Sequence, residues 1–227
     1  MKNSARCLYV QYGCGMSVAP QWINYDASPT LRLERIPLFG RLIAKNACRF
    51  PALVEYGDIV FGLPLREKSC QGVYCSHVLE HLALEDCRRA LRNTLKILKP
   101  GGIFRLVVPD LDHAVRSYIA DSSEMAAHRF MSETHLGQRV RERTLKGFAK
   151  MVWGNSSHLW MWNQRAMMAE LSRVGFVEIR RAVYGDSVDT MFGFAEDKER
   201  WINCLGIECK RPSDTVAVSM PHGSCGA

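Results

Sequence analysis

Residues Leu98-Lys-Pro-Gly-Gly-Ile-Phe-Arg-Leu-Val-Val-Pro-Asp110 combine a turn, an apolar run and a polar stop. Lys99 to Gly102 predicts the turn, residues 103–108 predict a strand, and Pro109-Asp110 ends it. A continuous apolar run is typical of a strand that is buried on both faces, as in a parallel sheet covered by helices. The sequence therefore predicts an α/β fold built around this strand.

Outward from this stretch, six more short apolar runs predict strands, which makes seven in all. They span residues 7–12, 22–25, 52–56, 72–75, 176–180 and 204–209. Apolar residues at three- and four-residue steps predict helices over 79–98 and 162–174, and Gly175 follows the second as a helix end. A strand, a helix and a parallel strand in succession should form a right-handed crossover.

The chain is long enough for one domain with an elaboration, which we place at residues 1–211. Residues 112–157 have helical spacing and follow the strand that ends at Asp110, so we expect a helical insertion there that roofs the ligand site. Residues 212–227 are rich in Ser, Gly and Pro and predict a flexible tail.

Composition excludes a disordered or fibrous protein, because 47% of the 227 residues are hydrophobic and 23% are charged. Met1 to Val10 does not resemble a secretory signal, and no apolar run is long enough to predict a membrane-spanning helix. The nine cysteines form no Cys-x-x-Cys pair and are interpreted as reduced thiols, so we expect a cytoplasmic protein.

The formal charge of +7 is concentrated in two segments. Residues 32–49 and residues 129–150 each carry an excess of four positive charges, so the rest of the chain is close to neutral. Solvated helix faces are one explanation of these segments. An anionic acceptor approaching beneath the roof is the other.

Polar or glycine-containing steps end the strands predicted in the first half of the chain. They are Gly13-Cys14-Gly15, Asp26, Asp58, Ser76-His77 and Asp110. In a parallel sheet these groups meet at one edge, where glycines allow close approach of a ligand and an Asp can accept ribose hydroxyls. Gly15 and Asp26 are separated by too few residues for a full helix, whose N-terminus a pyrophosphate would use, so a ligand without phosphate is favoured.

Two motifs now carry a resemblance to a known family. Tyr74-Cys-Ser-His-Val-Leu-Glu-His-Leu82 and the 98–110 stretch, together with Gln21-Trp-Ile-Asn-Tyr-Asp26, resemble class I S-adenosylmethionine-dependent methyltransferases with a shortened first helix. The resemblance covers roughly Leu8 to Glu208. It implies a Rossmann-like, mostly parallel seven-stranded sheet flanked by helices. It also implies S-adenosyl-L-methionine as cofactor, S-adenosyl-L-homocysteine as product, and a small-molecule or saccharide acceptor.

The resemblance also implies roles for individual residues. Gly13, Cys14 and Gly15 would pass beneath the methionine part of the cofactor, and Asp26 would hold the ribose, with Asn24 in the same group. Asp58 and the Ile59 amide would contact the adenine, and Ser76 and His77 would line the side of the methyl group. A base is needed only if the acceptor loses a proton in the transition state. His77 and His158 are the candidates.

Three alternatives remain open at this point. Gln11 and Cys70-Gln71 depart from the family pattern, which leaves room for a cofactor-binding protein without catalysis. An RNA methyltransferase is a second alternative, although no motif favours it. A zinc hydrolase is the third, because His77-Val-Leu-Glu-His81 matches an inverted zinc-protease motif. We predict no metal here, since the string begins at a strand end, and expect local hydrogen bonds of Glu80 and His81 to fix that junction.

Overall fold

The computed structural model describes residues 8–35, 49–138, 140 and 157–214, and it contains a seven-stranded sheet with the order β3-β2-β1-β4-β5-β7-β6. The strands are β1 (Leu8–Tyr12), β2 (Ile23–Asp26), β3 (Val54–Tyr56), β4 (Cys70–Ser76), β5 (Leu98–Pro109), β6 (Val177–Ala182) and β7 (Cys204–Lys210). Neighbouring strands from β3 to β5 are parallel, whereas β7 runs antiparallel to both β5 and β6. The predicted Rossmann-like, mostly parallel fold is confirmed.

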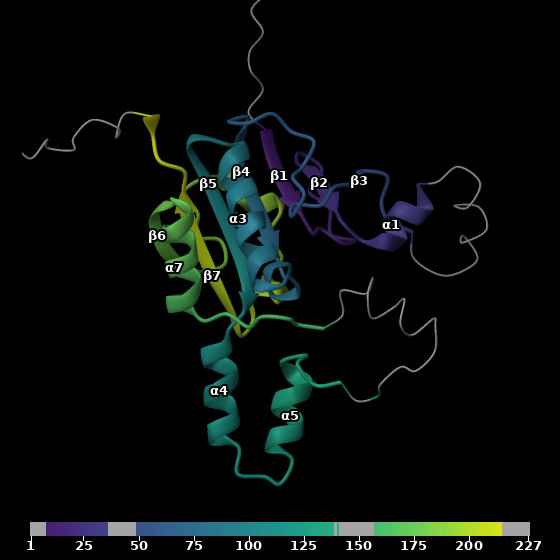
Figure 1. Cartoon of the computed structure of the whole chain (residues 1–227), viewed down its shortest axis with the longest axis vertical. Helices are drawn as coiled ribbons and strands as arrows, with labels where there is room; N and C mark the ends of the chain where they lie inside the picture. The colour runs from purple at the N-terminus through teal and green to yellow at the C-terminus, as the bar shows by residue number, and fades with distance from the viewer. Residues whose placement is uncertain (1–7, 36–48, 139, 141–156, 215–227) are drawn as a thin grey trace, which may run out of the picture.

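Helices cover the sheet and extend from one of its ends (Figure 1). They are α1 (Pro29–Glu34), α3 (Leu84–Ile97), α4 (Leu111–Ala120), α5 (Ala126–Glu133) and α7 (Gln164–Val174), with 3-10 turns at Leu79–His81, Thr190–Phe194 and Lys198–Trp201. α3 and α7 pack on one face of the sheet, and the hairpin of α4 and α5 projects away from it. No helix in the described part of the chain is both long and apolar enough to cross a membrane.

Successive side chains of β5 point to opposite faces of the sheet and pack into two different clusters. Phe104, Leu106 and Val108 pack with α3 and α7 in the larger core cluster. Ile103 and Val107 point the other way, into a smaller cluster with Phe192 of the 190–194 turn. Because successive strand side chains alternate between faces, a strand that is apolar throughout can serve both layers.

Arg105 lies on the second face and is completely buried. Its guanidinium group pairs with Glu208 of β7 at 3.0 Å, with Asp186 at 2.9 Å and with Glu196, and it stacks on the Trp201 ring at 4.7 Å. A buried charge is tolerated only where opposite charges and hydrogen bonds compensate it. Arg105 thereby fixes the segment that follows β6 to the centre of the sheet.

Two boundaries differ from the sequence prediction. β5 starts at Leu98 because Cys70 pairs with Leu98, so the 99–102 turn is incorporated into the strand as an irregularity. The helix predicted from residue 79 begins as a 3-10 turn, and α3 starts only at Leu84 because Leu82 and Ala83 are extended. At α7, Asn163 caps the start and Gly175 ends the helix in the left-handed region, as its position predicted.

The predicted insertion is present as α4 and α5, which begin directly after β5. The structure does not describe residues 36–48, 139 and 141–156, so 13 of the 18 residues of the first basic segment and 11 of the 22 residues of the second lie outside the described residues. The same holds for the predicted tail after residue 214. The domain limits at 1–211 stay a prediction.

We expect Arg105→Met to lower the free energy of unfolding by about 3–5 kcal/mol, because Glu196 would remain buried without a charged partner and Glu208 would keep only Arg180. Urea denaturation followed by circular dichroism measures the change. Arg89→Met is the matched control, since Arg89 is exposed and its ion pair with Asp86, at 3.7 Å, lies on the surface. It should change stability by less than about 0.5 kcal/mol. Equal effects of the two substitutions would contradict this role of Arg105.

Candidate functional site

Two glycines shape the turn after β1, and the structure gives them different roles. Gly13 has a φ of 64°, and a Cβ placed on it would lie 2.2 Å from Cγ2 of Val78. Gly15 has a φ of 55°, but a Cβ there would meet nothing within 4 Å. Both backbones favour glycine, yet only the Gly15 position is open enough for a ligand to approach.

Asp26 ties the end of β2 to this turn. Its Oδ2 accepts a hydrogen bond from the Gly15 amide at 2.8 Å, and its Oδ1 accepts one from the Ser28 amide at 2.7 Å. The carboxylate is buried apart from 8% of the residue surface. Each oxygen retains a lone pair, so the group can still accept hydroxyl hydrogens from a ligand.

Asn24 forms hydrogen bonds with the loop between β1 and β2. Its Nδ2 donates to the Ala19 and Trp22 carbonyls at 3.2 and 2.9 Å, and its Oδ1 accepts from the Ala19 amide and from Gln11 Nε2. Gln11 also donates to the Ser17 carbonyl at 2.8 Å. Since both side chains are buried, they hold residues 13–22 as a loop of turns in place of a helix. The side chains of Asn24 and Gln11 thus stabilise this loop through hydrogen bonds.

Asp58 and Ile59 follow β3 and reach the same edge of the sheet. The Gly57 amide donates to the Asp26 carbonyl at 3.1 Å, which joins the two strand ends. Asp58 Oδ1 accepts from the Val60 amide at 2.8 Å, and Asn93 of α3 donates to the Ile59 carbonyl at 2.8 Å. The structure therefore brings Asp58 and Ile59 beside Asp26, as the sequence predicted.

Ser76 and His77, which end β4, are bound by the 3-10 turn at Lys198–Trp201. Arg200 donates from Nε to Ser76 Oγ at 3.1 Å and from Nη2 to the Ser76 carbonyl at 2.7 Å. His77 has a φ of 56° and its Nε2 donates to the Arg200 carbonyl at 2.9 Å. Sequence reasoning missed Arg200, because 124 residues separate it from Ser76 and no motif surrounds it.

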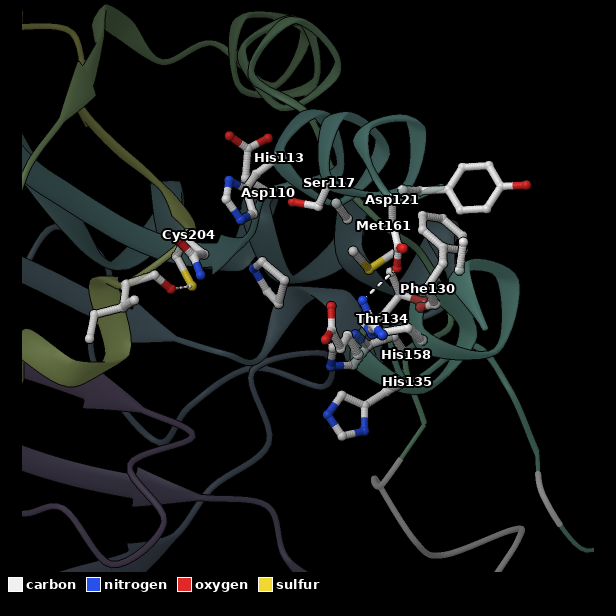
Figure 2. Close-up of a pocket in the computed structure, with 18 of the residues that line it drawn as sticks. Asp110, His113, Ser117, Asp121, Phe130, Thr134, His135, His158, Met161 and Cys204 are labelled. Atoms are coloured by element: carbon white, nitrogen blue, oxygen red, sulfur yellow. Dashed lines mark hydrogen bonds and ion pairs between the residues drawn. The ribbon is translucent and has the colours of Figure 1, made fainter. Parts of the chain in front are cut away.

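A pocket of about 600 Å³ lies between the end of β5 and the α4–α5 hairpin (Figure 2). It is lined mainly by polar side chains, with His113 and Ser117 from α4 on one side and Thr134 and His158 on the other. His77 and Cys204 lie at the sheet end of the pocket. The Gly13–Gly15 turn, Asp26 and Asp58 do not line it, so the predicted site residues form two neighbouring parts.

His158 and the Glu80-His81 pair meet beside this pocket, although 77 positions separate them in the sequence. The ring centroids of His81 and His158 are 4.9 Å apart, and His81 Nε2 is 3.9 Å from Glu80 Oε1. Neither carboxylate oxygen of Glu80 has a hydrogen-bond partner in the described part of the chain. The prediction that local hydrogen bonds of Glu80 fix the strand end is therefore wrong. The Glu80 backbone carbonyl does accept two amide hydrogens, from Leu159 and Trp160.

The two candidate bases differ in their electrostatics. Burial favours a lower pKa for His77, but contacts with Cys204, Glu80 and the Arg200 carbonyl outweigh it and raise the pKa to about 10. For His158 burial is the largest influence and lowers the pKa below its ordinary value, helped by His81 and His135. Neutral pH consequently favours the imidazolium form of His77 and the neutral form of His158.

Comparison with known proteins finds a family match for part of the chain. Residues 10–106 match the family described as "Methyltransferase domain". No curated protein matches the chain.

The solved structures that resemble the chain are distant in sequence. One is the complex of the Haloferax volcanii Trm112 methyltransferase activator with a methyltransferase described as putative. It has 16% identity and a TM-score of 0.49, with 91% of this chain and 83% of that one covered. A possible histamine N-methyltransferase from Thermotoga maritima has 14% identity and a TM-score of 0.47, with coverages of 90% and 82%. A methyltransferase from Archaeoglobus fulgidus has 14% identity and a TM-score of 0.48, with coverages of 91% and 87%.

We expect Gly13→Ala to destabilise the protein far more than Gly15→Ala. Both require a left-handed alanine, which costs about 1–2 kcal/mol, but only the Gly13 methyl group would overlap Val78. Thermal unfolding of the two variants measures the difference. If Gly13→Ala does not fold, the double variant with Val78→Ala should recover folded protein. A Gly15→Ala variant that is the less stable of the two would contradict this assignment.

Proposed function

Because residues 10–106 belong to the methyltransferase domain family, we propose that this chain transfers a methyl group from S-adenosyl-L-methionine to a small polar acceptor. The methyl donor of this family is S-adenosyl-L-methionine. The observation that carries the proposal is that the strand ends around Asp26 neighbour a pocket that has His77 at its sheet end.

The cofactor would occupy the edge formed by the ends of β1, β2 and β3. The open face at Gly15 admits the methionine part, Asp26 accepts the ribose hydroxyls, and Asp58 faces the adenine. Arg200 holds Ser76 and lies near Cys14, whose pKa it influences, so its guanidinium group is available to the methionine carboxylate. Arg200, from the C-terminal part of the chain, thus adds one cation to the cofactor-binding residues that the resemblance implied.

The pocket supports a polar acceptor. Tyr118 and Phe130 form an aromatic pair at 5.4 Å on its wall, a surface that stacks on a sugar or another ring. Its described lining contains three carboxylates, Asp110, Asp121 and Glu133, against Arg129, which is paired with Asp121, and the imidazolium form of His77. The excess of negative charge in this lining favours a neutral or cationic hydroxyl-bearing molecule over the anionic acceptor that the basic segments suggested.

The reaction needs little chemistry from side chains because the sulfonium group is already activated. A lone pair of the acceptor attacks the methyl carbon, the carbon–sulfur bond breaks, and its electron pair stays on sulfur to leave the thioether S-adenosyl-L-homocysteine. An acceptor hydroxyl would lose its proton to a base or to water. Alignment alone supplies a large part of the rate enhancement, on the order of 7–11 kcal/mol in intramolecular analogues.

We expect calorimetry to show that the purified protein binds S-adenosyl-L-homocysteine and that Asp26→Ala weakens this binding by about tenfold to a hundredfold. This is the range expected from the loss of charge-assisted hydrogen bonds worth about 1.5–3 kcal/mol. Asp121→Ala is the matched control, since Asp121 lines the acceptor pocket and should leave cofactor affinity unchanged. Thermal unfolding of both variants separates lost binding from lost structure.

Absence of binding by the folded wild-type protein would contradict the proposal. If binding is present, an acceptor screen with labelled cofactor separates the remaining alternatives. Methylation of saccharides or small metabolites supports the proposed acceptor class, and methylation of RNA alone contradicts it. Binding without transfer to any acceptor indicates a cofactor-binding protein, the alternative raised by the departures at Gln11 and Gln71.

A further inference from the structure

The carboxylate of Glu80 is buried and only partly compensated by the nearby His77 ring. Its side chain is only 1% exposed, and neither oxygen has a hydrogen-bond partner among the described residues. Leaving an ionised carboxylate in that state is costly, so a positive group is required beside it. One nitrogen of His81, one nitrogen of His158 and one oxygen of Glu80 lie within 4.8 Å of one another.

The two imidazole rings are oriented by the backbone. His81 Nδ1 is 3.1 Å from the Ser157 carbonyl oxygen. A carbonyl only accepts hydrogen bonds, so this nitrogen carries the hydrogen and Nε2 presents its lone pair toward Glu80. The His158 ring bonds the Thr134 backbone, while its Nδ1 is buried and has no partner in the described part of the chain. Histidines that bind metals are held in this manner, with the second nitrogen donating to a carbonyl or carboxylate.

A protonated His77 is the competing explanation of the buried charge. His77 Nδ1 lies 3.4 Å from Glu80 Oε1, while Nε2 donates to the Arg200 carbonyl. This contact does not explain the buried nitrogen of His158, which has no partner among the described residues. A single cation placed between Glu80, His81 and His158 would satisfy all three groups.

We propose that Glu80, His81 and His158 bind one first-row divalent cation, such as Zn²⁺, beside the acceptor pocket. Two imidazole nitrogens and one carboxylate form a donor set suited to such ions, whereas Mg²⁺ requires mainly oxygen ligands. The site differs from the inverted zinc-protease motif, in which His77 and His81 would be ligands and Glu80 a base. Here Glu80 is itself a ligand and His158 replaces His77.

The position of the site suggests what the cation does. His158 lines the pocket, so coordination positions that the protein does not fill would face a bound acceptor. A metal lowers the pKa of a coordinated hydroxyl, which would generate the oxygen nucleophile for methyl transfer. This role rests on the proposed function, but binding of the cation does not depend on it.

We expect the full-length protein, freed of metal by chelator dialysis, to bind one equivalent of Zn²⁺ in calorimetry. It should also bind one equivalent of Co²⁺ with visible absorption bands typical of nitrogen and oxygen ligands. Glu80→Gln, His81→Asn and His158→Ala should each weaken binding by about a hundredfold or more. His113→Ala and Cys204→Ser are the controls, because both residues line the same pocket outside the three-residue set. Their affinities should equal that of the wild type.

Stability provides a second readout that a purely structural role would not produce. Since Glu80→Gln removes the carboxylate that a bound cation would neutralise, only the wild type should gain stability on adding Zn²⁺. Strong sulfur-to-cobalt charge-transfer bands, a preference for Mg²⁺, or unchanged affinity in Glu80→Gln would overturn the proposal. Zn²⁺ binding in a protein that does not bind S-adenosyl-L-homocysteine would support the metal site and contradict only its role in methyl transfer.

Discussion

The turns that follow β1 and β4 touch at Gly13 and Val78, and both parts of the site depend on that contact. A single methyl group at Gly13 would overlap Val78, so the two turns can approach this closely only because residue 13 has no side chain. On one side of the contact lie Gly15 and Asp26, which would hold the cofactor. On the other side the chain turns at His77 and carries Glu80 toward the acceptor pocket. The distance between donor and acceptor sites is therefore governed by how closely two backbone turns pack.

The fold was largely predictable because its strands are short apolar runs that end in polar or glycine residues. Strand positions, the α3 and α7 regions and the insertion after β5 follow from local pattern alone. The strand-end pattern also predicted that Asp26 and Asp58 lie at the same edge of the sheet, since parallel strands bring their carboxyl ends to one edge. The start of β5 at Leu98 was missed because its pairing with Cys70 is a long-range contact that a local turn signal conceals.

Sequence reasoning missed the contacts that depend on distant partners. Asn24 belongs to a motif next to Asp26, but its amide is consumed by the loop that replaces the first helix. Arg200 lies in a stretch without a motif, and Arg105 lies within the apolar run of β5, yet each makes polar contacts with groups 78 to 124 positions away. Glu80 and His81 were seen as a local pair because nothing in the sequence places His158 beside them. Pattern and spacing identify elements, whereas these assignments require the three-dimensional arrangement.

The hairpin that walls the acceptor pocket leaves and rejoins the sheet at one point. Asp110 bridges to Trp162, and the Leu111 amide donates to the Trp162 carbonyl at 2.9 Å, so the segment between them is closed at its base. The entropy of closing such a segment grows only slowly with its length, and none of its described residues belongs to the hydrophobic core clusters. Insertions or deletions between residues 111 and 161 would thus alter the acceptor wall at little cost to the sheet. Under the proposed function, the acceptor wall would change with this segment while the strand ends that would hold the cofactor stay in place.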